Sequence, residues 1–107
     1  MILSWSEHPA AAGEVYDAAL WYQAEAPDVA RRFAVRVQQS IDSIRQWPYA
    51  ASLYRDTESE PQIRSKQVNG FPYQVLYIIR DNELIVVAYA HERRRPGYWR
   101  DRLHSVL

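Results

Sequence analysis

A chain of 107 residues is long enough for one domain with a single hydrophobic core. Its formal net charge of zero, with 48% hydrophobic and 24% charged residues, argues against both a disordered and a membrane-spanning chain. The absence of cysteine excludes disulfides and thiolate metal sites. The first residues lack the pattern of a secretory signal peptide, so we expect a cytoplasmic protein that does not associate with membranes.

The first third of the chain predicts a short strand and a helix. Ile2–Trp5 alternates enough for a strand, and Ser6 has the character of an N-cap for a helix that continues to about Glu25. Apolar residues in this helix recur on one stripe that we expect to face the core, with Glu14 and Asp17 outside it. The members of that stripe are Ala12, Val15, Ala19, Tyr22 and Ala26.

A second helix follows almost at once and makes a helical hairpin. Pro27 breaks the first pattern, and either Asp28 or the residue before Pro27 can cap the next helix. Apolar residues then recur at spacings of three and four until Trp47-Pro48 ends the helix. They are Ala30, Phe33, Val37, Ile41 and Ile44. Residues 49–61 are polar and without periodicity, which predicts a connection.

From residue 63 onward the hydrophobic period is two, which predicts strands. Asn69-Gly70 separates Ile63–Val68 from Phe71–Arg80 and is a strong hairpin signal. Asp81-Asn82 predicts a second reversal, into a strand over Glu83–His91 whose centre is apolar on both faces.

One or two helical turns over Tyr98–Leu103 are predicted to end the chain. The fold class is therefore α+β, with a helical hairpin packed on a small, mostly antiparallel sheet. The elements follow the order β-α-α-β-β-β with a short C-terminal helical turn. Residues 1–107 are expected to form one domain.

The charges are divided unevenly along the chain. Residues 1–30 contain five acids and no Lys or Arg, whereas residues 31–107 carry all 13 basic side chains and a net charge of +5. Overall neutrality argues against a nucleic-acid ligand, but this distribution is compatible with an acidic face beside a basic one. It is equally compatible with charges sorted by chance.

The most specific motif lies near the end of the chain. Residues 91–102 read His-Glu-Arg-Arg-Arg-Pro-Gly-Tyr-Trp-Arg-Asp-Arg and contain every fixed position of the pattern H-x-R-R-x-P-x-Y-W-x-x-R. Residues 69–77 supply a strand Asn-Gly-Phe-Pro-Tyr-Gln-Val-Leu-Tyr, and Tyr22 precedes Phe33 in the helical hairpin. With these features and its order of elements, the chain resembles the RelE/ParE superfamily of toxins, also called the plasmid stabilisation protein family, over nearly its full length.

The resemblance implies a toxin of a type II toxin–antitoxin system that a cognate antitoxin holds inactive in a hetero-oligomer. Two activities divide the superfamily. One branch cleaves mRNA at the ribosome, and the other inhibits DNA gyrase by binding it. No cofactor is expected, and the three histidines are too scattered in sequence to predict a metal site.

RNA cleavage would need a base, cations for the developing charge and an acid. His91 is the best titratable candidate, with Lys66 and Tyr98 behind it, and Arg93 can supply charge but cannot be the base. Basic and aromatic residues are the candidates for target binding: Arg64, Arg94, Arg95, Trp99 and Arg102. Each has a plainer interpretation: His91 as a structural histidine, Tyr98 and Trp99 as packing residues, and the arginines as a solvated surface.

One departure from the superfamily pattern bears on the choice of target. The ribonuclease branch has an arginine directly after a tyrosine on a central strand, where this chain has Gln74 after Tyr73. Losing one cation of an active site lowers a rate by about 10² to 10³, and overall neutrality points the same way. The favoured hypothesis is gyrase inhibition, with an mRNA endoribonuclease and an inactive toxin-fold binding module as alternatives. Whether the protein is an enzyme is therefore left open.

Overall fold

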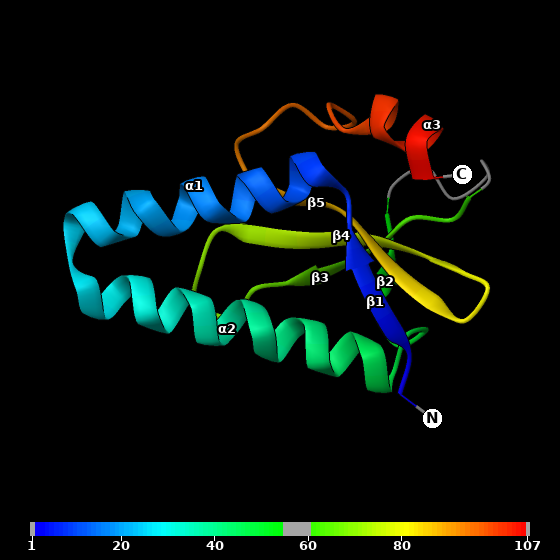
Figure 1. The fold of residues 1–107 in the computed structure, drawn as a ribbon, viewed down its shortest axis with the longest axis horizontal. Helices are drawn as coiled ribbons and strands as arrows, with labels where there is room; N and C mark the ends of the chain where they lie inside the picture. The colour runs from blue at the N-terminus through cyan, green and yellow to red at the C-terminus, as the bar shows by residue number, and fades with distance from the viewer. Residues whose placement is uncertain (1, 55–60, 107) are drawn as a thin grey trace.

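The computed structural model describes residues 2–54 and 61–106, which form a five-stranded sheet with two long helices packed on one face (Figure 1). The C-terminal segment packs on the other face. In chain order the elements are β1 (Ser4–Glu7), α1 (Pro9–Glu25), α2 (Pro27–Gln46), β2 (Ser52–Leu53), β3 (Arg64–Gln67), β4 (Tyr73–Arg80), β5 (Glu83–His91), a 3₁₀ turn (Arg100–Arg102) and α3 (Leu103–Val106). The predicted α+β class and the predicted order of its elements are confirmed.

The strands lie in the order β1-β5-β4-β3-β2, and only the β1–β5 pair is parallel. β1 begins two residues later than the sequence predicted, because its pairing with β5 extends from Ser4 to Glu7. Ser6 therefore lies in the strand, and its predicted role as N-cap of α1 is wrong. His8 takes that role, with its Nδ1 accepting the N–H of Ala10 at 3.0 Å.

β2 was not predicted. Its two residues, Ser52 and Leu53, pair antiparallel with β3, and a two-residue strand is too short to show any periodicity. The rest of the predicted connection falls partly on residues 55–60, which lie outside the described part of the chain.

The two helices differ in how well the sequence predicted their inner faces. All five predicted core residues of α2 are buried, as is Ser40, whose hydroxyl donates to the carbonyls of Arg36 and Gln67. In α1 the most buried positions are Ala11 and Ala18, while the predicted Val15, Ala19 and Tyr22 are only partly buried. The inner stripe is therefore rotated from the prediction, and the rotation brings Glu14 inward.

The two predicted reversals in the sheet are present. Asp81 and Asn82 have positive φ values of 52° and 63°, as a two-residue hairpin turn of type I′ requires. Asn69 and Gly70 form the centre of the other turn, in which the N–H of Phe71 donates to the carbonyl of Val68 at 3.1 Å. β4 starts at Tyr73 rather than at Phe71, however, so this connection is longer than predicted.

A β-bulge interrupts the pairing of β4 with β5. Leu76 pairs with Ala88 and Tyr77 with Val86, so Val87 is an extra residue on β5. Val87 and Ala88 both pack on the sheet face that carries the C-terminal segment, whereas Tyr89 packs on the helix face.

Two hydrophobic cores result, one on each face of the sheet. The helix-side core contains Phe33, Ile41, Ile44, Val75 and Tyr77. The opposite core is centred on Trp99, which is 1% exposed and lies edge-on to Tyr54 with ring centroids 5.4 Å apart. The helical turns predicted over 98–103 occur slightly later, at 100–106, because Trp99 packs into this core ahead of them.

Tyr77, on β4, is hydrogen-bonded to the segment that follows α2. This tyrosine should make the free energy of unfolding depend on pH. Its hydroxyl donates to the carbonyl of Pro48 at 2.7 Å, and burial raises the pKa of Tyr77 to about 12. A tyrosine in the unfolded chain loses its proton near pH 10, so the folded state binds this proton more tightly. The free energy of unfolding should therefore fall between pH 10 and 12. Urea unfolding across this range should show a smaller fall in Tyr77→Phe than in the wild type. The control Tyr16→Phe, whose side chain is exposed, should show the same fall as the wild type. Equal losses in all three proteins would contradict this assignment.

Candidate functional site

The carboxylate of Glu14, on α1, is the centre of a hydrogen-bond network. Its Oε1 accepts from Arg102 Nη1 at 2.8 Å and from the backbone N–H of Tyr89 at 3.1 Å. Its Oε2 accepts from Arg102 Nη2 at 3.1 Å and from the hydroxyl of Tyr98. The Glu14 and Arg102 side chains are each 16% exposed, so this is a bidentate ion pair largely removed from water.

This network covers an edge of the sheet beyond the end of β1. The last β1–β5 pair joins Glu7 and Val86, and past Val86 no strand among the described residues pairs with that side of β5. Glu14 accepts the N–H of Tyr89, and Arg102 Nη1 donates to the carbonyl of Val87 at 3.1 Å. Side chains thus satisfy backbone groups that a longer β1 would otherwise pair.

The same network fixes the protonation of Tyr98. Burial raises the pKa of Tyr98, and the hydrogen bond and negative charge of Glu14 raise it further, against smaller opposing effects of Arg102 and Arg94. Burial lowers the pKa of Arg102, but the Glu14 carboxylate outweighs that effect and the net change is upward. At neutral pH the phenol is therefore protonated and the guanidinium charged.

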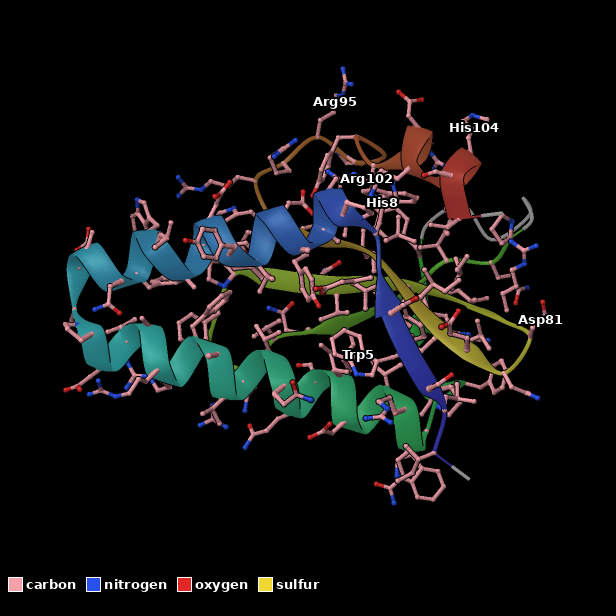
Figure 2. The ribbon with its side chains drawn as sticks, viewed as in Figure 1. Trp5, His8, Asp81, Arg95, Arg102 and His104 are labelled. Atoms are coloured by element: carbon pink, nitrogen blue, oxygen red, sulfur yellow. The ribbon has the colours of Figure 1, made fainter. Side chains whose placement is uncertain are left out.

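Further contacts hold the C-terminal segment against the rest of the domain. Because His8 Nδ1 accepts the N–H of Ala10, its Nε2 carries the proton and donates to Ser105 Oγ at 2.8 Å. Arg80 Nη1 donates to the carbonyl of Val106 at 2.6 Å. Figure 2 shows Arg102 and His8 together at the beginning of α1, with His104 pointing away from them. The segment that follows the arginine run is thus fixed at several points.

A cleft of about 440 Å³ lies between α1 and the end of β5, and we call it the aromatic cleft. It is lined by Glu14, Asp17, Ala18, Trp21, Tyr22, Tyr73, Tyr89, His91, Arg94 and Tyr98. A smaller cleft of about 140 Å³ shares His91, Arg94 and Tyr98 with it and adds Gln74 and Arg95. His91 and Arg94 therefore border both clefts.

His91 is held in one orientation at the end of β5. Its Nδ1 accepts the N–H of Arg93 at 3.1 Å, and its ring lies edge-on to Tyr73 with centroids 5.0 Å apart. The contact with Arg93 leaves Nε2 as the ring nitrogen with which His91 could meet a ligand.

The arginine run forms an exposed basic loop, residues 92–97, directly after β5. The Arg94 guanidinium lies over the ring of Tyr98, 3.9 Å from its centroid. Arg95 points away from the domain (Figure 2). Within residues 2–54 and 61–106, no ion pair involves Arg93, Arg94 or Arg95.

Residues 7–96 match the sequence model of the family described as ParE toxin of type II toxin–antitoxin system, parDE. The chain belongs to this family. The predicted membership of the RelE/ParE superfamily is thereby confirmed, and membership makes the chain a type II toxin with a cognate antitoxin as its implied partner. No curated protein matches the chain.

The structure brings some of the predicted site residues of this toxin together and separates others. His91, Arg94 and Tyr98 share the aromatic cleft, and Arg93 and Arg95 lie beside it in the basic loop. Lys66 is half-buried on β3, where it pairs with Val75, and it borders neither cleft that contains His91.

Three of the predicted target-binding residues have partners within the toxin itself. Arg64 Nη1 donates to the carbonyls of Ala51 at 2.8 Å and Tyr49 at 3.2 Å, which holds the connection from α2 to β2. Trp99 is buried in the second core and Arg102 pairs with Glu14, so neither lies open to a target in this structure. The plainer interpretation of Trp99 as a packing residue fits this burial.

Glu14 is a site residue of the toxin that the sequence analysis did not predict. The predicted apolar stripe of α1 passes through Ala12 and Val15, which puts Glu14 on the outer face of the helix. A stripe drawn through Ala11 and Ala18 instead puts Glu14 on the inner face, three residues after the first of them. A lone acid on an apolar helix face was the available signal.

Two other features, a membrane-spanning helix and a metal-binding cluster, are absent from the described part of the toxin. No helix in the described part of the chain is both long and apolar enough to cross a membrane. Nor do residues 2–54 and 61–106 contain a group of three or more His, Asp or Glu side chains that could bind a metal ion.

Removing the charge of Glu14 should destabilise the toxin. In Glu14→Gln the Arg102 guanidinium loses its anionic partner while it stays largely buried, so we expect the free energy of unfolding to fall by about 2 to 3 kcal/mol. Asp17→Asn is the matched control, because it removes an exposed acid from the same helix and should change stability by less than about 0.5 kcal/mol. Urea unfolding at pH 7 measures both changes. Similar losses in the two variants would show that the network does not stabilise the domain.

Proposed function

We propose that this toxin acts by binding DNA gyrase through its basic loop, and that it does not cut mRNA. The observation that carries the proposal is the contrast between two sets of side chains. Arg93 and Arg95 are exposed and form no ion pair within the described residues, whereas Tyr98 and Arg102 are engaged by Glu14 inside the domain.

The candidate catalytic residues are not well placed for RNA cleavage. General acid–base catalysis needs titratable groups within hydrogen-bond reach of the reacting atoms. The Tyr98 hydroxyl donates a hydrogen bond to Glu14, and burial together with that carboxylate raises the pKa of Tyr98, so it is a poor proton donor to a leaving group. Arg102 is neutralised by Glu14, and Lys66 lies elsewhere on the sheet. Of the four predicted catalytic residues, this leaves His91 and Arg93 beside the clefts, and an arginine cannot complete an acid–base pair.

The same contacts favour a binding function. A loop that is already ordered loses little conformational entropy when it meets a partner. The basic loop is fixed at one end by β5 and at the other by Trp99 in the core and Tyr98 on Glu14. Its guanidinium groups are thereby presented in a defined arrangement, suited to an acidic surface on the target.

The decisive experiment compares gyrase inhibition with translation. Purified toxin should inhibit supercoiling by gyrase and leave translation intact, and Arg93→Ala combined with Arg95→Ala should weaken that inhibition by at least about ten-fold. Arg32→Ala is the control, because it removes an exposed arginine from α2, away from the loop. Absence of inhibition by the wild-type protein at micromolar concentration would overturn the proposal, and so would equal inhibition by the loop variant.

An mRNA endoribonuclease is the second candidate, and one observation favours it. His91 and Arg94 border both clefts, so a base and a cation lie side by side at an accessible site. This function predicts cleavage of ribosome-bound mRNA that is lost in His91→Ala. An inactive binding module would be indicated if induced expression affected neither growth, DNA topology nor translation.

We also infer that the toxin is held in a cytoplasmic hetero-oligomer with its antitoxin. The net charge of +5 over residues 31–107 would complement an acidic antitoxin segment. A small reading frame beside the toxin's own gene would identify the antitoxin, and co-purification of its product would test the complex.

A further inference from the structure

Helix α1 has an apolar face on each of its two sides. The inner one packs on the core through Ala11 and Ala18. On the outer side Tyr16 is 63% exposed, Leu20 50% and Trp21 62%. Gly13 and Ala24 are exposed on the same side and extend this row in both directions. We call the five outer residues the outer stripe: Gly13, Tyr16, Leu20, Trp21 and Ala24.

The spacing of the outer stripe is that of a helix-packing surface. Gly13, Tyr16, Leu20 and Ala24 follow one another at intervals of three, four and four residues, with Trp21 beside them. Single exposed apolar side chains are ordinary, whereas an aligned row of them marks a surface that another element covers. A helix that is apolar on both sides is normally packed on both sides, and α2 lies along only one side of α1 (Figure 1).

Gly13 gives a second, independent reason to expect a partner. Glycine within a helix destabilises it relative to alanine. Apart from the adjoining backbone of α1 itself, a Cβ atom added at Gly13 would meet no described atom within 4 Å, so nothing else in the domain requires a glycine here. Close approach of another backbone from outside would require one.

The charges around the outer stripe indicate what kind of partner fits. Residues 1–30 contain no Lys or Arg. Asp17 is exposed within the row, three residues before Leu20 and four before Trp21, and Glu25 is exposed directly after Ala24. Pairing two copies of α1 would bring these carboxylates together, whereas a helix with basic residues flanking its apolar face would neutralise them. Trp21 also borders the aromatic cleft, so a long side chain on the partner could reach into it.

We propose that the outer stripe is a docking site for an amphipathic helix of another protein, with Lys or Arg flanking the apolar face of that helix. The outer stripe lies on α1, and its Trp21 shares the aromatic cleft with Arg94 of the basic loop. The proposal does not depend on which target the loop binds. It places the acidic part of the chain against a basic helix.

The test uses the full-length protein and two labelled peptides of about 20 residues, the length at which a designed helix is well populated. The peptides share one Leu/Ala stripe and differ only in having Lys or Glu beside it. Fluorescence anisotropy should show the Lys-flanked peptide binding at least about ten-fold more tightly than the Glu-flanked one. Gly13→Leu and Trp21→Ala should each weaken that binding by about ten-fold or more.

Two further variants separate docking from a general loss of structure. Gly13→Ala should raise the Tm of the free protein and still weaken peptide binding, a combination that a purely structural glycine would not give. Val35→Ala is the control, because Val35 is 54% exposed on α2 and lies outside the outer stripe, so binding should not change.

Three results would overturn the proposal. The first is that neither peptide binds, or that the Glu-flanked peptide binds better. The second is equal binding by Gly13→Leu and the wild type. The third is a dimer in sedimentation that Leu20→Glu dissociates, since a second copy of the chain would then cover the stripe.

Discussion

The domain depends on how it satisfies the edge of β5 that β1 leaves unpaired. A short first strand would expose backbone groups of the most buried strand in the protein, and these groups are costly to leave without partners. The carboxylate of Glu14 and the guanidinium of Arg102 pair with them instead. In doing so they join α1, β5 and the C-terminal segment at one point. The orientation of the basic loop, which lies between β5 and that segment, follows from this junction.

The sequence predicted what neighbouring residues determine. The inner face of α2 follows from spacings of three and four, and the turn at Asp81-Asn82 from residues that tolerate positive φ. It did not predict what distant partners determine. The later start of β1 depends on pairing with β5, and the two-residue β2 exists only because β3 lies beside it. The inward rotation of Glu14 likewise depends on groups at 89, 98 and 102.

The C-terminal motif illustrates the same limit for the site. As a string, residues 91–102 identify a superfamily but do not separate residues that meet a partner from residues that hold the loop in place. The structure divides them. Trp99 and Arg102 face inward and support the loop, while the Arg93 and Arg95 guanidinium groups are open to solvent. Burial of an indole or pairing of a guanidinium depends on the whole domain, so residue type alone could not have shown it.

The bulge at Val87 determines on which face of the sheet every later side chain of β5 lies. Side chains alternate between the two sides of a strand, and one inserted residue reverses the parity of the remainder. In an unbroken ladder His91 would share a side with Ile85 and Val87, over the core that contains Trp99. With the insertion, it stands opposite Tyr73 at the mouth of the aromatic cleft. Deleting this one valine would remove the bulge and restore strict alternation while His91 stays opposite Tyr73, so the bulge is what lets β5 hold one extra residue without turning the histidine over.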